Sequence, residues 1–446
     1  MTYLIILSRD TQSYNNGTRK LRAIPNSTSY FLSNSYQQGA KAFEIQGDDG
    51  TFLGTDRTAS VLAVNIRQQD DKKSEPKKLL QVFDIKTQAK RVEIPLEGCS
   101  NVSHNNIVYC HNGADKKLVA VNILNGKTIA DFPATDRPTQ IQLLGSQQDT
   151  DILQITANDT DDNKGKSELM AVTGSQVRWN ESTNNEEQCG VIDKGRTIVC
   201  QSPKSDAPDT TKIRTIRSQD GNEIATRETT AQIALTSDGW MEKSPEQEAS
   251  SPTTTAAFTS HLSIKKTNAA PLPEPNKIFG VDAKEKGTTQ NWGESTFYPN
   301  ETGDKALNTE TLAYPSHVIE AMKHNAGGIV TADGEINLIR VPSHNANDYS
   351  FAHLGGPEIV FSISAADKIL STSKNGLLVL LKLDNSANKN NSLFTLYDTQ
   401  LGTTVLDIED EGNDELTVIN GHIAVTKKAK TTGKFEKLVI YLPEGK

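Results

Sequence analysis

The chain contains only four cysteines, and they form two pairs with the same spacing. Ten residues separate Cys99 from Cys110, and ten separate Cys189 from Cys200. In both pairs a β-branched run ends at the second cysteine, and a polar turn lies midway between the two. This pattern predicts two strands joined by a short turn, with a cysteine at the far end of each strand.

Strands paired across a short hairpin bring such cysteines close enough to bridge. Four cysteines allow three connectivities, and we expect Cys99 to pair with Cys110 and Cys189 with Cys200. In the chain-entropy picture, closing a loop of this size gives roughly 3 kcal/mol of stability. Two alternatives stay open, four unrelated buried thiols or a zinc site, although no C-x2-C or nearby histidine pair supports zinc. Disulfides would indicate an oxidising compartment.

A second motif recurs along the chain. Each copy is a strand that mostly alternates apolar and polar residues, followed by an Asp- or Asn-rich turn with Gly and then by another strand. Gly supplies the positive φ that such a turn needs. The copies begin at Lys78, Lys117, Glu168, Lys212, Lys277, Leu393 and Lys437, with a shortened one at Gly328. Repeats of about 40 to 65 residues, one four-stranded unit each, indicate a β-propeller.

The closing pattern, apolar-x-apolar-Asp-x-x-x-Gly, resembles the repeat of the quinoprotein-like (pyrroloquinoline-quinone-repeat) β-propellers over about residues 55–446. That family's repeat usually ends with a Trp after the Gly. Here Trp179 follows Gly174 by five residues, and Trp292 follows Gly287 by five. The family's cofactor-binding residues cannot be traced in this chain, so the resemblance implies the fold without the quinone. Members of that branch, including outer-membrane assembly lipoproteins, are binding scaffolds.

We therefore expect an all-β fold with a single domain over residues 1–446. It would be a seven- or eight-bladed β-propeller of four-stranded antiparallel blades, closed between the N- and C-terminal strands. In that closure, residues 3–7 would pair with the hairpin strand around residues 438–441. A pair of unrelated β-sandwiches is the alternative.

Two segments depart from the repeat. Residues 8–57 are rich in Asn and Ser and are expected to form a first, diverged blade, with short strands near residues 30–33 and 42–45. Residues 242–327 begin with a run rich in Ser, Thr and Pro that lacks core-forming periodicity, and we expect a long insertion there. It would include a short helix that begins after Ser316, which would cap it.

Two acidic segments are candidate ion sites. Asp159, Asp161 and Asn163 resemble the start of a calcium loop, because alternate oxygen ligands along a turn can surround a hard cation. The Gly stands one position late and no Glu occupies the twelfth position, so a plain acidic turn is favoured. Residues 407–415 form a second acidic turn, either solvated or a weak cation site. We expect no resident cofactor, with calcium as the alternative.

No catalytic motif is found: the sequence lacks G-x-G-x-x-G, a P-loop, H-E-x-x-H and G-x-S-x-G. We therefore name no catalytic residue. The net charge of −9 argues against nucleic acid or an anionic membrane as partner, because both need a basic surface. No stretch reaches the roughly 18 apolar residues of a membrane helix.

Together these features favour a non-catalytic, extracytoplasmic β-propeller that acts as a protein-binding or scaffold module of the cell envelope or surface. Its expected partner is an envelope protein, and nothing indicates its oligomeric state. No export signal is visible after Met1, so export would require a signal or anchor upstream; a cytosolic protein with reduced thiols is the alternative. Two other functions stay open: a propeller enzyme (a quinone-dependent dehydrogenase or a hydrolase) and a module that only spaces other domains.

Overall fold

In the computed structural model of this protein, the regular elements of the described residues are antiparallel β-strands, preceded by one short 3-10 helix, η3 (Asn34–Gln38). No helix in the described part of the chain is long and apolar enough to cross a membrane. The structure describes residues 32–69, 77–133, 138–157, 166–184, 187–192, 195–204, 207–229, 232–236, 239–243, 258–261, 329–330, 336–341, 348–353, 359–364, 368–372, 377–383, 392–399, 401–410, 414–429 and 431–444.

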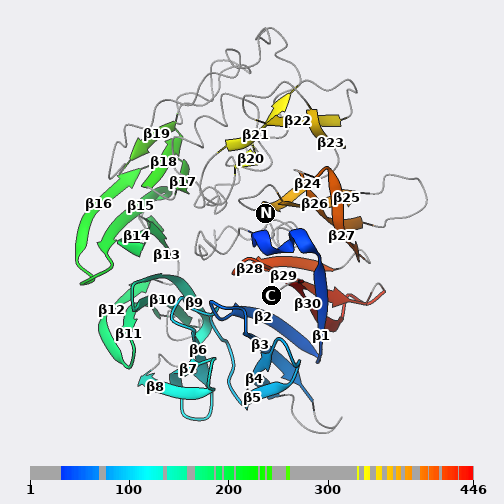
Figure 1. Ribbon diagram of the computed structural model, residues 1–446. Coiled ribbons are helices and arrows are strands. Elements are labelled where there is room, and N and C mark those ends of the chain that lie inside the picture. Colours follow the sequence, from blue (N-terminus) through cyan, green and yellow to red (C-terminus); the bar gives the residue numbers. More distant parts are fainter. Residues whose placement is uncertain are drawn as a thin grey trace.

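The described strands form eight antiparallel sheets, six with four strands and two with three (Figure 1). The first two contain β2 (Asp49–Thr55), β3 (Val61–Gln68), β4 (Lys77–Asp84) and β5 (Lys90–Ile94), then β6 (Ile107–Asn112), β7 (Lys117–Asn122) and β8 (Lys127–Pro133). The next two contain β9 (Pro138–Gln147), β10 (Thr150–Ala157), β11 (Lys166–Thr173) and β12 (Gln176–Asn184), then β13 (Gln188–Ile192), β14 (Thr197–Lys204), β15 (Ala207–Arg217) and β16 (Glu223–Thr229).

The remaining sheets follow in chain order. They contain β17 (Gln232–Thr236), β18 (Gly239–Lys243) and β19 (Phe258–His261), then β20 (Ile329–Val330), β21 (Ile336–Val341), β22 (Asp348–His353) and β23 (Ile359–Ser364). The last two contain β24 (Lys368–Thr372), β25 (Leu377–Leu383), β26 (Ser392–Asp398) and β27 (Thr403–Asp410), then β28 (Glu415–Ile419), β29 (His422–Lys428) and β30 (Phe435–Pro443) together with β1 (Ala40–Gln46). Figure 1 shows these sheets following one another around a common centre, which is the arrangement of a β-propeller.

Central strands are buried on both faces, because alternate side chains point to opposite faces of a sheet. On β3, Val61 and Ala63 belong to a core shared with β6 and β7, whereas Leu62 and Val64 belong to a core shared with β1, β29 and β30. In total five such cores lie between neighbouring sheets and join the six consecutive sheets from β24–β27 through β13–β16. The inner strands therefore read as continuous apolar runs.

The sequence repeat corresponds to equivalent strands. The described copies are β4, β7, β11, β15, β26 and β30, and each of the first five is followed by a turn. In the β7–β8 turn, Asn122 Oδ1 accepts the Leu124 N–H (2.9 Å), and Gly126, at φ +69°, donates its N–H to the Asn122 carbonyl (2.8 Å). In the β26–β27 turn, Gly402, at φ +67°, donates to the Asp398 carbonyl in the same way (2.9 Å). The repeated Asp or Asn and Gly are therefore turn residues.

The tryptophan after this turn links one sheet to the next. Trp179 lies on β12, and its Nε1 donates to the Ser218 carbonyl in the β15–β16 turn (2.9 Å). Its ring lies so close to Gly221 that a Cβ there would come within 2.8 Å of it. Val92 on β5 covers Gly126 in the same way, since a Cβ on Gly126 would lie 2.3 Å from Val92 Cγ2. These glycines are thus required by packing as well as by φ.

The N-terminal strand of the described chain differs from expectation. A strand exists near residues 42–45, but as part of β1 it pairs with β30, with Phe43 opposite Ile440. The described part therefore contains no separate first blade over residues 8–57, because β2 already begins the following sheet. Ser33 is not in a strand; its hydroxyl caps η3 and accepts the Ser35 N–H (3.3 Å).

Several predictions fall on residues outside the described part. These are the strand at residues 3–7, the repeat copy at Lys277, Trp292 with Gly287, and the helix after Ser316. Within the expected insertion, residues 242–327, the described strand β19 pairs antiparallel with β18. The rest of that span, beyond Lys243 and β19, is not described.

Candidate functional site

The four cysteines form two disulfides, Cys99–Cys110 (S–S 2.03 Å) and Cys189–Cys200 (S–S 1.98 Å), and no thiol is free. Cys189 and Cys200 stand opposite each other on β13 and β14. The segment before β6 runs antiparallel to it in the same manner, with the Ser100 N–H donating to the Tyr109 carbonyl (2.8 Å). This is the pairing expected within each hairpin, and it leaves no thiolate for zinc.

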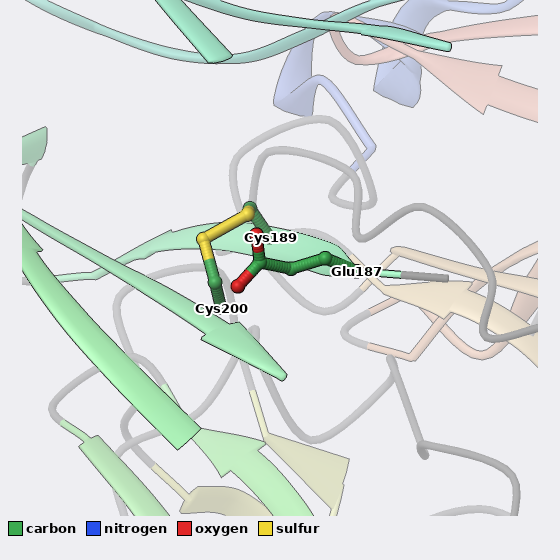
Figure 2. A group of neighbouring side chains, drawn as sticks. All are labelled: Glu187, Cys189 and Cys200. Carbon is green, nitrogen blue, oxygen red and sulfur yellow. A yellow bond between two sulfur atoms is a disulfide. The ribbon is translucent and has the colours of Figure 1, made fainter. Parts of the chain in front are cut away.

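Glu187 lies beside the second disulfide (Figure 2). Its carboxylate oxygen and the sulfurs of Cys189 and Cys200 lie within 4.8 Å of one another, close enough for ligands of one metal ion. The sulfurs, however, are bonded to each other. The carboxylate is also occupied, because Arg214 binds it in a bidentate manner, Nε to Oε1 at 2.7 Å and Nη2 to Oε2 at 2.8 Å. This cluster is therefore a buried ion pair.

Arg214 also bridges two sheets. Its Nη1 donates to Glu181 Oε1 on β12 at 2.6 Å, while Glu187 precedes β13. Its hydrogen bond to Glu187 is the largest of the effects that raise the pKa of Arg214 above its ordinary value. The guanidinium thus stays charged and joins the outer strand of one sheet to the inner strand of the next.

Amide side chains fix both cysteine hairpins to the sheet that precedes them. Gln154 on β10 donates Nε2 to the Glu187 carbonyl (2.7 Å) and accepts the Cys189 N–H on Oε1 (3.2 Å). Asn65 on β3 donates to the Leu96 carbonyl (3.0 Å), three residues before Cys99. All three bonds satisfy backbone groups of an inner segment that would otherwise lack a partner on that side.

The first hairpin places Glu97 where the second has Glu187, two residues before the first cysteine in each. Its partner is different. The carboxylate is 45 % exposed and lies 3.4 Å from Nδ1 of His111. Opposite Cys110 stands Val119, at the position that Arg214 occupies opposite Cys200.

The two acidic segments have different outcomes. Asp159, Asp161 and Asn163 lie outside the described residues, so the calcium-loop prediction stays a prediction. In the second acidic turn, two of the described carboxylates are already paired with lysines. Asp414 accepts from Lys427 Nζ (2.6 Å), and Glu415 accepts from Lys428 Nζ (2.5 Å). Asp414 and Glu415 therefore give no support to a cation site in this turn.

The described residues also include a row of polar turns. Each connects the first strand or inner segment of one sheet to its second strand, and the row spans five consecutive sheets. We call it the turn row and define it as residues 419–422, 56–60, 103–106, 147–150 and 195–196.

Hydrogen bonds between sheets join the first three of these turns. Asn420 Nδ2 donates to the Val102 carbonyl beside the third turn (3.4 Å). The backbone N–H of Arg57 donates to Asn106 Oδ1 (3.2 Å), and its Nε donates to the His104 carbonyl (2.6 Å). The turns of three sheets therefore hold one another in fixed positions.

The row continues through a buried aspartate. Asp151, at the start of β10, is fully buried and accepts from Asn105 Nδ2 (3.1 Å), Ser146 Oγ (2.6 Å) and Tyr109 Oη (2.9 Å). Burial raises the pKa of Asp151, and these hydrogen bonds oppose that rise. Beyond it, Gly195 approaches the Ser146 carbonyl so closely that a Cβ would lie 2.9 Å away.

A second buried aspartate lies within the turn row itself, in the β2–β3 turn. Asp56 accepts the N–H groups of Thr58 (3.0 Å), Ser60 (2.6 Å) and Val61 (2.7 Å), and so closes the β2–β3 turn. Burial acts to raise the pKa of Asp56, but these bonds and the Thr58 hydroxyl outweigh it, and the pKa is lowered.

Left-handed residues are concentrated in the turn row. Ala59, Asn106, Gln148 and Asn420 have φ between +50° and +60°, one in each of four turns. Asn tolerates this region, but Ala and Gln adopt it only where the surrounding structure imposes it, and such residues cluster at functional sites. The row is thus a rigid surface that carries local strain.

The exposed side chains of the row define its chemistry. Arg57 and His104 are exposed on adjacent turns, and Gln148 and Asp149 on the next. Burial, and then the charge of Arg57, lower the pKa of His104 against the opposing charge of Asp151. These residues could not be found as a sequence motif, because the residues of each turn differ from those of the next. The signal that could have found them is positional: a short polar turn precedes the β-branched second strand of each sheet.

No protein-family model and no curated protein matches this sequence. Among solved structures, the chain is similar to BamB from Moraxella catarrhalis (TM-score 0.37, 9 % identity, 90 % of this chain and 98 % of that chain). It is also similar to a europium-containing methanol dehydrogenase (TM-score 0.38, 10 % identity, 94 % of this chain and 91 % of that chain). It covers only 37 % of a Pyrococcus horikoshii acylaminoacyl peptidase, matched over 48 % of this chain (TM-score 0.32, 9 % identity). With TM-scores this low, the assignment to a propeller rests on the sheet topology alone.

Proposed function

We propose that this protein is a protein-binding scaffold and that the turn row is a contact surface for its partner. One observation carries the proposal: turns from five consecutive sheets are held in fixed relative positions by hydrogen bonds between the sheets and by close backbone packing. A surface that is already ordered loses little conformational entropy on binding. Loops positioned by a rigid scaffold are also the usual place for recognition.

The proposal includes a closed ring of eight blades. The eight described sheets and the pairing of β1 with β30 support this count and this closure. We also place the protein in the cofactor-free branch of the quinoprotein-like propellers. The Trp179 contact with the next sheet's turn supports the quinoprotein-like assignment. An absorption band of a bound quinone in protein purified from its source would contradict the cofactor-free assignment.

We further propose an extracytoplasmic location, with an envelope protein as the partner. The two disulfides support it, because disulfides persist in oxidising compartments and are rare in the cytosol. A non-reducing peptide map of protein from the source cell tests this location. Linked peptides 99–110 and 189–200 are the expected result, and free thiols at these positions would contradict it.

The contact surface is tested by matched charge reversals. Arg57→Glu changes the turn row, whereas Lys434→Glu makes the same charge change in the exposed β29–β30 turn, at the opposite end of the strands. Cross-linked partners from an envelope fraction are quantified by mass spectrometry for both variants and the wild type. We expect partners that are lost with Arg57→Glu and retained with Lys434→Glu. Equal recovery with both variants would refute the turn row as the contact surface.

A further inference from the structure

A groove of about 280 Å³ lies between strand β1 and the neighbouring sheet β2–β5. None of its lining residues belongs to the turn row. Its lining includes Phe43 and Phe83, whose rings meet edge to face with centroids 5.4 Å apart. This volume is enough for a short stretch of chain with one or two side chains, and is just below the range of typical small-molecule sites.

The groove borders the backbone edge of β1. Four consecutive residues of this strand, Phe43 to Gln46, line it. Because successive side chains of a strand point to opposite faces, a groove that contacts all four must run along the edge of the strand. Among the described strands, β1 is the last in its sheet and pairs only with β30. Its second edge therefore faces the groove.

The register shows which backbone groups point into the groove. The Glu444 N–H donates to the Gly39 carbonyl (3.0 Å), and these two residues extend the β1–β30 register by one pair. In an antiparallel ladder hydrogen-bonded and non-hydrogen-bonded pairs alternate. The backbone groups of Ala42, Glu44 and Gln46 therefore point away from β30, toward the free edge.

The walls of the groove are amides, and its charged groups are already paired. Gln46, Gln68, Gln81 and Gln88 line it, and an amide carries both donors and an acceptor, although Gln81 already uses Nε2 to donate to Glu93 Oε2 (2.9 Å). Glu44 at the rim is paired with Lys437 (2.7 Å). Lys90, also at the rim, is paired with Glu93. A neutral groove of this kind selects against a strongly charged ligand and favours uncharged hydrogen-bonding groups.

We propose that this groove accepts an extended, uncharged segment of a partner polypeptide, which adds to β1 as a further strand. The free edge supplies the backbone hydrogen bonds of such strand addition, and the amide walls bind polar side chains of the added segment. The inference does not depend on the turn row, because the two surfaces share no residue. A negative result for one surface therefore leaves the proposal for the other surface unaffected.

The test uses two variants at one position. Glu44→Pro removes an N–H that faces the groove, at a position where β1 gives no bond to β30, and proline is tolerated on edge strands. Glu44→Ala keeps that N–H and removes the same contact with Lys437, so it is the matched control. The probe is a fluorescent synthetic peptide, selected from a random 12-residue display library against the wild-type protein in competition with the Glu44→Pro protein. Binding is measured by fluorescence anisotropy.

We expect Glu44→Pro to weaken binding about tenfold relative to Glu44→Ala, the change typical of one lost hydrogen bond. Hydrogen exchange of the bound wild-type protein should slow at Ala42, Glu44 and Gln46 and remain unchanged at Phe43 and Ile45. If Glu44→Pro does not fold, as judged by circular dichroism, Gln46→Pro with Gln46→Ala replaces it.

Three results would overturn the proposal. The first is equal peptide affinity of the proline and alanine variants. The second is a library selection that yields no binder dependent on this position. The third is preferential binding of a neutral oligosaccharide, such as chitotetraose, with an affinity that the proline substitution leaves unchanged, since this would make the groove a sugar site.

Discussion

The two cysteine hairpins have the same covalent design and different electrostatic surroundings. Each has a glutamate two residues before its first cysteine, and each has a disulfide between residues eleven apart. In the second hairpin Glu187 is buried and held by the two-pronged contact with Arg214. In the first, Glu97 is half exposed and faces His111. The spacing of the cysteines thus determines the disulfide. The residue opposite the second cysteine on the next strand, Arg214 or Val119, determines whether the glutamate is part of the core.

The largest expected effect comes from removing the cation of the second hairpin. Arg214→Met leaves Glu187 buried without its charged partner, and should lower the free energy of unfolding by about 3–5 kcal/mol. Replacing both residues, Arg214→Met with Glu187→Leu, should restore most of this loss because no charge is then left buried. Urea denaturation of the single and double variants measures both changes.

The matched control is Arg217→Ala, an exposed pair with Asp220 that should change stability by less than about 1 kcal/mol. A loss of similar size for Arg214→Met would show that the two hairpins do not differ in the way described. A double variant as unstable as the single one would show that packing of the arginine stem, rather than its charge, stabilises the second hairpin.

Removing each disulfide sharpens the comparison. Both bridges close loops of the same length, with a sequence separation of 11, so the chain-entropy account predicts equal losses of roughly 3 kcal/mol. Paired Cys→Ala variants, Cys99 with Cys110 and Cys189 with Cys200, are compared in the same denaturation assay. Losses that differ by more than about 1 kcal/mol would mean that the surroundings, and not loop closure alone, set the contribution of each bridge.

The amide contacts should contribute less. Gln154→Leu leaves the buried Glu187 carbonyl and Cys189 N–H without this partner, and should cost about 2 kcal/mol. Asn65→Leu makes the matching change in front of the first hairpin, where Nδ2 donates to the Leu96 carbonyl (3.0 Å) and to the Leu79 carbonyl (3.2 Å). This variant leaves only carbonyls without that partner, and no backbone N–H, and an under-satisfied carbonyl is better tolerated than an orphaned N–H. We expect a smaller loss there, measured in parallel. A larger loss for Asn65→Leu would show that the amide contact in front of the first hairpin contributes more stability than the one in front of the second, which contradicts this prediction.

The smallest effect is expected at the glutamate of the first hairpin. Glu97→Gln should change the free energy of unfolding by no more than about 0.5 kcal/mol, because its exposed carboxylate is screened by solvent. Glu187→Gln, at the buried position, should cost at least about 2 kcal/mol. Comparable values for the two substitutions would contradict the assignment of one glutamate to the surface and the other to the core.

Much of the fold could be predicted from local patterns. The strand copies, their Asp/Asn-x-x-x-Gly turns and the cysteine pairs follow from φ requirements and β-branched runs within one hairpin. The pairing of β1 with β30 was not predictable in this way. Its strand was expected near residues 42–45, but the sheet that it joins is set by residues about four hundred positions away, and the apolar pattern of Phe43 and Ile45 fits either sheet.

The candidate site was not predictable from the sequence. Arg214 binds a glutamate on another strand, and no periodic pattern connects the two positions. The turn row depends on contacts between different sheets, such as Arg57 with Asn106 or Asn105 with Asp151. Each of these residues reads in the sequence as an ordinary polar turn residue, and only the order of the sheets brings them together.

The most direct test of the central claim, that the turn row binds a protein partner, is site-specific photo-crosslinking in the source cell. A photoreactive residue replaces Asp149, exposed in the turn row, or Thr431, exposed in the β29–β30 turn at the opposite end of the strands. We predict a discrete cross-linked partner from position 149 and none from position 431. A partner captured only from position 431, or none from position 149, would contradict the account.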